Sequence, residues 1–313
     1  MTEMPSPPPY RYRMSGLNVV SDIALPMRTL LDPTGDFPAD VTIQLDMVPE
    51  RLEQATHQGP NWMADASRFL LDLPEIGRFM AVGGRRLTLW PAPGMPVDDI
   101  LVFATGTAMA GILYQRGALL LHGSAVIHEG QAFVFCGPSG AGKSTLAGAL
   151  VRAGCGFLAD DVCSVEQADD GTPLILPDGR ALRLYADSIE QVGLTGATGP
   201  RVRRQVEKFH VAPPGGMGGT QGVPLAAIYM LADANPAFPP GIAGLSSLAA
   251  AQALLRQAYR RRLALAYSSQ GRLAARTAAL LSHAGVYQLH RPRDFARLDD
   301  TVAQLRAHWA QLS

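Results

Sequence analysis

One short segment, residues 137–144, constrains the fold more than any other part of the 313-residue chain. It reads Gly-Pro-Ser-Gly-Ala-Gly-Lys-Ser and fits the pattern G-x-x-x-x-G-K-[ST] at every position. An apolar run, 132–136, comes directly before it, and a helix-forming stretch, 143–152, overlaps its end. A strand, a glycine-rich loop and a helix in this order form the context in which the pattern binds phosphate. The segment therefore predicts an α/β fold with a nucleotide-binding core.

The residue types in this loop suit a bound nucleoside triphosphate. Glycines lack a Cβ atom and accept positive φ angles, so the backbone can approach phosphate oxygens closely. The freed N–H groups and the helix N-terminus then face the anionic oxygens. We expect Lys143 to reach the β- and γ-phosphates and the Ser144 hydroxyl to ligate Mg²⁺. The predicted cofactors are ATP and Mg²⁺, and the predicted nucleotide-contacting residues are Gly137, Pro138, Ser139, Gly140, Ala141, Gly142, Lys143, Ser144 and Thr145.

Two adjacent carboxylates follow the loop after a single helix. Asp160 and Asp161 lie at positions +17 and +18 relative to Lys143 and end a short buried-type run, 156–159. This spacing predicts that they lie near the mouth of the loop, and we interpret them as functional. The chain has neither the LSGGQ-like signature of transporter ATPases nor the NKxD motif that reads guanine. Other Asp-Asp pairs lie outside such runs, at 98–99, 169–170 and 299–300.

The apolar run before the loop is predicted to have an antiparallel partner. Residues 118–127 and 132–136 flank a turn at Gly130 and indicate a β-hairpin. His122 interrupts the first of these runs, where a polar side chain is unexpected. One interpretation is a core histidine with its hydrogen bonds satisfied, and the other is a functional histidine beside the loop.

A basic cluster precedes a second glycine-rich stretch, 213–222, which is predicted to be a flexible loop. Arg204, Val206 and Lys208 alternate, so they would share one face of a strand. Lys208 and Lys143 are the only two lysines, against 25 arginines. A cation beside a mobile loop can close over a transferring phosphate, which makes Arg204 and Lys208 candidate catalytic residues. The alternative is a solvated basic edge strand.

The remaining pattern predicts two domains, an accessory or substrate-recognition domain at 1–96 and a kinase-type domain at 97–313. The first is expected to be a smaller α+β domain with a frayed end at 1–9 and a linker at 91–96. Its expected elements are strands at 41–45 and 86–90 and a helix at 66–71. The second begins with an apolar helix and ends in a mainly helical region from 246. Its expected further strands are 156–159, 162–167, 174–176, 181–185, 227–231 and 286–289.

Composition excludes several classes of protein. The 27 basic and 27 acidic side chains balance, which argues against a general nucleic-acid binder. The longest uncharged stretches, 100–114 and 241–255, fall short of the ~20 residues of a spanning helix. Three cysteines without a CxxC pair do not indicate a disulfide framework. With no apolar leader near residue 1, we expect a cytoplasmic protein that binds neither nucleic acid nor membrane.

Three of these features together resemble the catalytic domain of the HPr kinase/phosphorylase family, bacterial enzymes that phosphorylate a serine of a protein. The resemblance covers the segment 122–161, from His122-Gly through Gly-Pro-Ser-Gly-Ala-Gly-Lys-Ser to Leu-Ala-Asp-Asp. The histidine stands at position −21 and the second aspartate at position +18 relative to Lys143, as in that family. The resemblance implies that Asp161 accepts the proton of the substrate hydroxyl and that Asp160 ligates metal or orients the site. It implies that His122 supports the reacting phosphate or the aspartate.

The chain also departs from that family. Its Glu-Ile-Arg-Gly signature is replaced by Leu-Arg-Leu-Tyr-Ala-Asp-Ser, in which Asp187 is a candidate metal ligand. The late loop associated with the reverse, phosphorylase reaction is not recognisable, since 213–222 does not match it, so the reverse reaction is not expected from the resemblance. The segment before the linker does not look like the family's regulatory domain. The layout is similar to divergent HPr-kinase-like enzymes encoded beside peptide-modification genes, including kinases of lasso-peptide precursors.

The expected function is transfer of the γ-phosphoryl group of ATP to a serine-type hydroxyl of a peptide or protein. A nucleotide-gated ATPase switch without a phosphoacceptor is one alternative, and a small-molecule kinase is another. HPr kinases assemble as hexamers, so by analogy a homo-oligomer is a further expectation.

Overall fold

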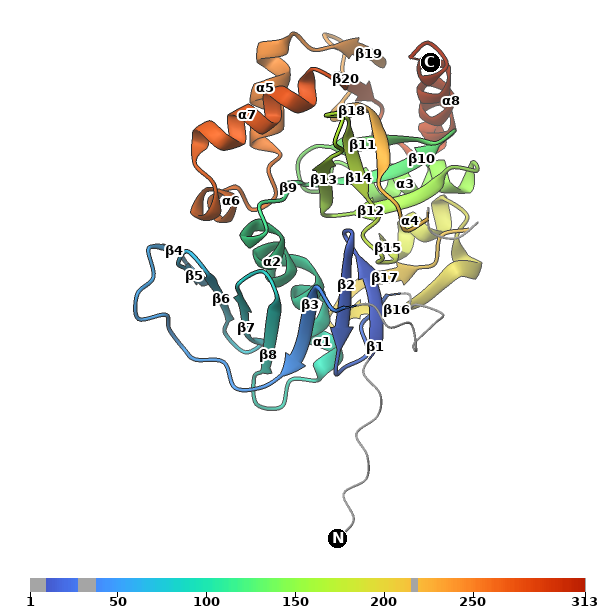
Figure 1. The fold of residues 1–313 in the computed structure, drawn as a ribbon. Coiled ribbons are helices and arrows are strands. Elements are labelled where there is room, and N and C mark those ends of the chain that lie inside the picture. The colour runs from blue at the N-terminus through green and yellow to red at the C-terminus, as the bar shows by residue number, and fades with distance from the viewer. Residues whose placement is uncertain (1–9, 28–37, 215–218, 313) are drawn as a thin grey trace.

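The chain forms a mixed α/β fold built around two large sheets and one small sheet (Figure 1). This computed structural model describes residues 10–27, 38–214 and 219–312. The predicted frayed end at 1–9 and part of the predicted loop at 213–222 lie outside these residues.

The first sheet, here the N-terminal sheet, contains eight strands. In spatial order they are β1 (Tyr10–Met14), β2 (Leu17–Ser21), β3 (Val41–Leu45), β8 (Arg86–Pro91), β7 (Gly77–Val82), β6 (Arg68–Leu73), β5 (Trp62–Ala64) and β4 (His57–Gly59). The strands predicted at 41–45 and 86–90 are confirmed. The helix predicted at 66–71 is wrong, because this short apolar run is β6, hydrogen-bonded to β5 and β7. Among the described residues before Val97 there are strands and loops but no helix, which corrects the α+β expectation.

The second sheet, here the central sheet, surrounds the glycine-rich loop. One path through it runs β12 (Gly156–Asp160), β10 (Gly123–His128), β11 (Gln131–Cys136), β18 (Val223–Asp233), β14 (Pro173–Leu176), β13 (Cys163–Gln167) and β9 (Leu119–Leu121). β20 (Gly285–Arg291) pairs in parallel with β18, and β19 (Gly241–Gly244) pairs with β20. The predicted hairpin before the loop is confirmed as β10 and β11. A small sheet contains β15 (Leu182–Tyr185), β17 (Val206–Val211) and β16 (Thr198–Arg203).

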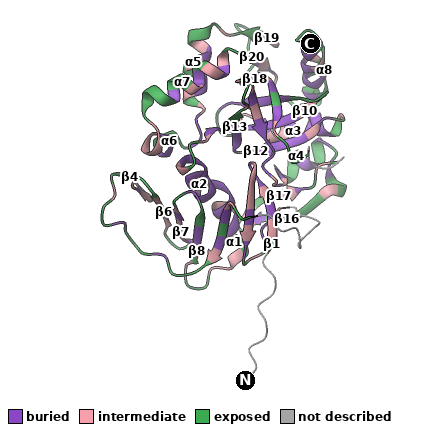
Figure 2. Ribbon diagram, viewed as in Figure 1, coloured by how far each residue is buried: buried purple, intermediate pink, exposed green. Residues whose placement is uncertain are grey.

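Helices cover both faces of the central sheet. The helical elements are α1 (Val97–Phe103), the π-helix η1 (Ala104–Ala108), α2 (Met109–Gln115), α3 (Lys143–Arg152), α4 (Ala186–Gln191), η2 (Thr195–Ala197), α5 (Ser247–Arg256), α6 (Arg261–Tyr267), α7 (Gln270–Leu281), η3 (Phe295–Arg297) and α8 (Leu298–Trp309). Along β11, Phe135 packs with α3 and α8, whereas its neighbour Val134 packs with α5 and α7. This alternation follows from the two-residue period of a strand. Figure 2 shows the resulting buried layer between the helices.

The helix at 97–115, formed by α1, η1 and α2, packs against the N-terminal sheet. It is apolar and long enough to cross a membrane by length and composition, but 67% of its most apolar window is buried inside the molecule. Ile100 and Ile112 share one core with Phe79 and Leu89 of the sheet. This core joins side chains from both sides of residue 96, and the division into domains at that point stays a prediction.

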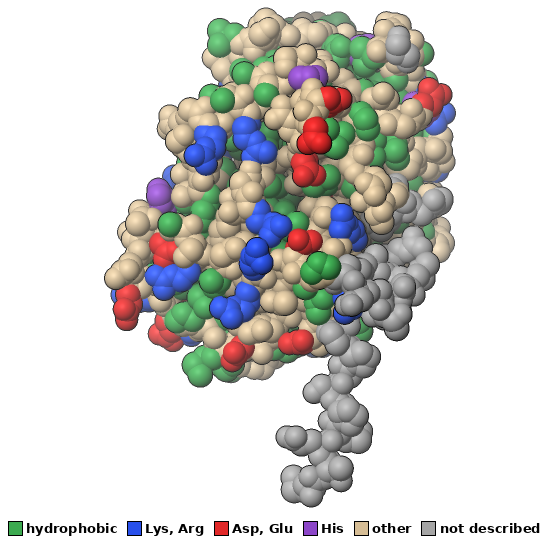
Figure 3. Space-filling model, viewed as in Figure 1, with side chains coloured by type: hydrophobic (Ala, Val, Ile, Leu, Met, Phe, Trp, Pro, Cys, Tyr) green, Lys and Arg blue, Asp and Glu red, His purple; other side chains and the backbone are tan. Residues whose placement is uncertain are grey.

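The molecular surface carries charges of both signs. On the face in Figure 3, Lys and Arg side chains lie among Asp and Glu side chains rather than covering one continuous area. The three cysteines, Cys136, Cys155 and Cys163, are buried and free.

The contact between α2 and β6 can be tested at Gly111. A Cβ atom there would lie 2.4 Å from the Phe69 ring, so we expect Gly111→Leu to lower the free energy of unfolding by about 1–3 kcal/mol through overpacking. Gly271→Leu is the matched control, because Gly271 is also helical and has open space around its Cβ position. Urea unfolding of both variants measures the difference, and equal effects would contradict the packing described.

Candidate functional site

The glycine-rich loop joins the end of β11 to the start of α3. Gly137, Gly140 and Gly142 have φ angles of 155°, 77° and 80°, which other residues rarely adopt. Gly142 also approaches Arg291 closely, because an added Cβ atom would lie 2.4 Å from the guanidinium Nη2. The glycines of the sequence pattern are therefore required by the backbone, as predicted.

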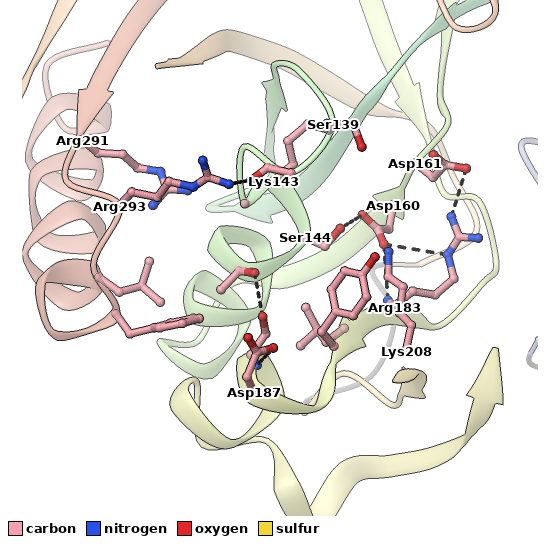
Figure 4. Close-up of a pocket in the computed structure, with 18 of the residues that line it drawn as sticks. Ser139, Lys143, Ser144, Asp160, Asp161, Arg183, Asp187, Lys208, Arg291 and Arg293 are labelled. Carbon is pink, nitrogen blue, oxygen red and sulfur yellow. Dashed lines mark hydrogen bonds and ion pairs between the residues drawn. The ribbon is translucent and has the colours of Figure 1, made fainter. Parts of the chain in front are cut away.

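The loop borders a cavity of about 570 Å³ (Figure 4). The predicted site residues that line it are His122, Ser139, Gly140, Gly142, Lys143, Ser144, Thr145, Asp160, Asp161, Asp187 and Lys208. The structure therefore brings together side chains that are widely separated in the sequence, from His122 to Lys208. Gly137, Pro138 and Ala141 belong to the same loop but do not line the cavity.

Asp160 lies at the floor of this cavity with 2% of its surface exposed. Its Oδ1 accepts hydrogen bonds from the Ser144 hydroxyl at 2.7 Å and the Ser124 hydroxyl at 2.6 Å. The backbone N–H of Arg183 donates to Oδ2 at 3.3 Å. Asp160 thus contacts Ser144 of the loop, as its spacing predicts, and Asp161 lines the same cavity.

Asp161 follows Asp160 in the chain, and its carboxylate faces the side chains of Arg183 and His122. Its Oδ2 is 3.0 Å from Nη2 of Arg183, and its Oδ1 is 3.4 Å from Nδ1 of His122. Burial raises its pKa, but the His122 hydrogen bond and the charges of Arg183 and Arg180 outweigh this, so the pKa lies well below its usual range. The Asp161 carboxylate is consequently charged at neutral pH and only weakly basic.

His122 occupies the break between β9 and β10 rather than the interior of a strand. Its Nδ1 lies 3.0 Å from the carbonyl oxygen of Asp161, and its ring centroid lies 5.9 Å from that of Tyr259. A third of its side chain is exposed, toward the cavity. His122 is therefore not a fully buried core residue, and its functional role stays a prediction.

Lys143 is buried at the first position of α3. Its ammonium donates to the carbonyl oxygens of Gly137 at 2.9 Å and Pro138 at 3.1 Å. Burial lowers its pKa, while the nearby Cys136, Asp160 and Asp161 act in the opposite direction. The ammonium thus lies inside the curve of the loop, within reach of an anion that enters the cavity.

The two candidate cations of the basic cluster have different locations. Lys208, on β17, lines the cavity, and its ammonium lies 5.3 Å from the centroid of the Tyr185 ring. Arg204 lies in the turn between β16 and β17, not on a strand face shared with Lys208, because the hairpin reverses there. Its side chain is 76% exposed and pairs with Asp99, 3.6 Å away, outside the cavity.

Three arginines that the sequence did not single out also line the cavity. Arg183 contacts Asp161 from β15. Arg291 and Arg293, at and just beyond the end of β20, donate to the carbonyl oxygens of Ala141 and Gly140, each at 2.6 Å. Figure 4 shows both arginine side chains beside the loop.

The donor set around Ser144 suits Mg²⁺ rather than a metal held by protein alone. Across the described residues, no group of three His, Cys, Asp or Glu side chains forms a metal cage. Ser144 and Asp160 offer hard oxygen ligands side by side, and Mg²⁺ usually takes one or two such ligands together with phosphates and water. Asp187 lines the same cavity on α4, where its Oδ1 accepts from the N–H of Ser188 at 2.6 Å.

Comparison with known proteins gives a distant structural similarity. No protein-family model matches the sequence, and no curated protein matches it. The structure is similar to the solved structure of the Hpr(Ser) kinase/phosphatase from Coxiella burnetii, with 13% sequence identity and a TM-score of 0.32. The match covers 62% of this chain and 97% of that one. It indicates at most a distant relationship, and a function has to be argued from the geometry of the cavity.

The low pKa of Asp161 predicts a particular dependence of stability on pH. A carboxylate whose pKa is lowered by folding stabilises the protein above its unfolded pKa of about 4 and loses this contribution as the pH falls. We expect the wild type to exceed Asp161→Asn in free energy of unfolding at pH 7, with a smaller difference below about pH 4. Denaturant unfolding from pH 7 to 3.5 measures this, with exposed Asp46→Asn as the control. A difference in free energy of unfolding between the wild type and Asp161→Asn that increases as the pH falls would contradict the lowered pKa of Asp161.

Proposed function

We propose that the protein is a kinase that transfers the γ-phosphoryl group of Mg·ATP to a serine-type hydroxyl of a peptide or protein. The observation that carries this proposal is the contact between Ser144 and Asp160, with Asp161 beside it in the same cavity. A hydroxyl and carboxylate for the metal, a lysine for the phosphates and a second carboxylate for the acceptor are the parts that phosphoryl transfer needs.

In this proposal the triphosphate lies along the loop, with the loop N–H groups and Lys143 against its oxygens. Lys143 would exchange its bonds to Gly137 and Pro138 for bonds to phosphate. Leu184, Phe295 and Leu298 give the cavity apolar lining suited to a nucleoside. Ser144 and Asp160 would hold Mg²⁺, with Asp187 as a further candidate ligand, and the ion would neutralise charge on the phosphates.

Asp161 would orient the acceptor hydroxyl and accept its proton late in the transfer. A weakly basic carboxylate suffices, because the transition state of phosphoryl transfer is loose and the hydroxyl becomes acidic only as the new P–O bond forms. His122 and Arg183 fix the orientation of this carboxylate. Lys208 lines the cavity and adds positive charge near the transferring group, whereas Arg204, outside the cavity, is not part of this mechanism.

The test of the proposed base is Asp161→Asn. We expect phosphoryl transfer from γ-labelled ATP to an acceptor polypeptide to fall by about 100-fold or more, with ATP binding retained. Lys143→Ala should abolish transfer and weaken ATP binding, because the phosphates lose their cation. Asp170→Asn, in an exposed turn, is the matched control and should keep full activity.

Near-normal transfer by Asp161→Asn would refute the assigned base. ATP hydrolysis by the wild type without label on any acceptor would instead favour a nucleotide-gated switch. Label found only on metabolites would identify a small-molecule kinase.

The metal site predicts a second result. Removal of Mg²⁺ with EDTA should stop transfer, and Ser144→Ala should raise the Mg²⁺ concentration needed for half-maximal activity about tenfold, since one metal ligand is lost. Ser144→Thr is the matched variant, because it keeps the hydroxyl and should keep the wild-type requirement. Titration of activity against Mg²⁺ measures both, and an unchanged requirement in Ser144→Ala would exclude this residue as a ligand.

A further inference from the structure

A second cavity, of about 430 Å³, lies between the N-terminal sheet and the start of α6. Figure 1 shows α6 beside the outer strands of that sheet. The apolar side chains that line the cavity are Trp62, Phe69, Leu71, Leu73, Phe103 and Leu263. Such a cavity at the junction of two parts of a fold is a common place for a ligand.

The edge of this second cavity is strongly positive. Arg260, Arg261 and Arg262 follow one another in the chain, line the cavity and are exposed. None of the three forms an ion pair with a described residue, and no Asp or Glu of the described chain lines the cavity. Exposed Arg201, by contrast, pairs with Glu207. The charge left uncompensated here favours a negatively charged occupant.

One buried tyrosine connects this second cavity to the candidate active site. The hydroxyl of Tyr259 lies 3.5 Å from Oδ2 of Asp161, and its ring lies beside His122. The guanidinium of Arg260 stands 5.7 Å from the ring centroid of Tyr259. Arg260 lines the second cavity, whereas His122 and Asp161 line the first. Tyr259 thus contacts residues that line both cavities.

We infer that the second cavity binds the polypeptide that carries the acceptor hydroxyl, through a segment with a large apolar side chain flanked by Asp or Glu. This inference rests on the proposed function. The apolar lining would bury the apolar side chain, and the three arginines would contact the acidic ones. A polypeptide anchored there would contact Arg260, which packs near Tyr259, and the hydroxyl of Tyr259 lies 3.5 Å from Oδ2 of Asp161.

A binding experiment tests the cavity without catalysis. The probe is a fluorescein-labelled peptide, Gly-Asp-Glu-Leu-Phe-Glu-Asp-Ser-Gly, measured by fluorescence anisotropy with the full chain at low salt. One control peptide carries Lys in place of the acidic residues, and another carries Ala-Ala in place of Leu-Phe. We expect the probe to bind at least tenfold more tightly than either control. Equal affinity for all three peptides would overturn the inference.

Protein variants locate the binding. The double variant Arg261→Glu with Arg262→Glu should weaken probe binding at least tenfold, whereas Lys at both positions should retain most of it. Arg256→Glu is the matched control, because Arg256 is exposed on α5 and outside the cavity. Unchanged ATP affinity in each variant verifies folding. Full probe binding by the double variant would contradict the site.

Kinetics separate this inference from the proposed function. If both hold, the double variant raises the KM for a polypeptide acceptor and leaves the KM for ATP unchanged. If the double variant transfers phosphate with an unchanged KM for the acceptor, the docking site is wrong but the proposed kinase activity is not affected. If the wild type binds the probe specifically but phosphorylates no hydroxyl, the proposed kinase activity is wrong but the cavity is still a polypeptide-binding site.

Discussion

The carboxylate of Asp160 joins segments that are far apart in the sequence. It lies on β12 and accepts hydrogen bonds from Ser124 on β10, Ser144 on α3 and the backbone of Arg183 on β15. A buried carboxylate without such donors would cost several kcal/mol, so these segments can pack only in an arrangement that supplies them. The same arrangement sets the position of the loop, of the small sheet that carries Lys208, and of Asp161, the next residue along the chain.

A second buried pair ties this centre to the N-terminal half of the molecule. Asp178 and Arg180 are almost fully buried and form an ion pair of 2.9 Å. Arg180 also donates to the carbonyl oxygens of Asp160 at 3.0 Å and Thr105 at 3.1 Å. Thr105 belongs to the π-helix η1, an irregularity that interrupts an otherwise α-helical segment and is frequent at functional sites. The helix that covers the N-terminal sheet is therefore linked to the backbone of the candidate active site through the side chain of Arg180.

The parts that could be predicted from the sequence depend on short separations along the chain. The loop, the hairpin before it and the proximity of Asp160 to Ser144 all follow from a strand, a turn and a helix that succeed one another directly. Arg291 and Arg293 could not be found in this way, because they meet the loop only through the parallel pairing of β11, β18 and β20. The apolar run at 66–71 is too short for its pattern of hydrophobic residues to distinguish a helix from a strand. Its pairing with β5 and β7 in the sheet determines that it is a strand.

Lys143 illustrates how the loop keeps its shape. Because its ammonium is bonded to two carbonyl oxygens of the loop, a phosphate that enters replaces existing interactions rather than satisfying a vacant donor. In the proposed kinase, affinity for the nucleotide would reflect a difference between two sets of bonds, and it would be weaker than the new contacts alone suggest. The reverse exchange would accompany departure of the nucleotide, since the lysine regains partners within its own loop. An empty loop with satisfied hydrogen bonds and reversible binding of a phosphate would thus be compatible in one short stretch of chain.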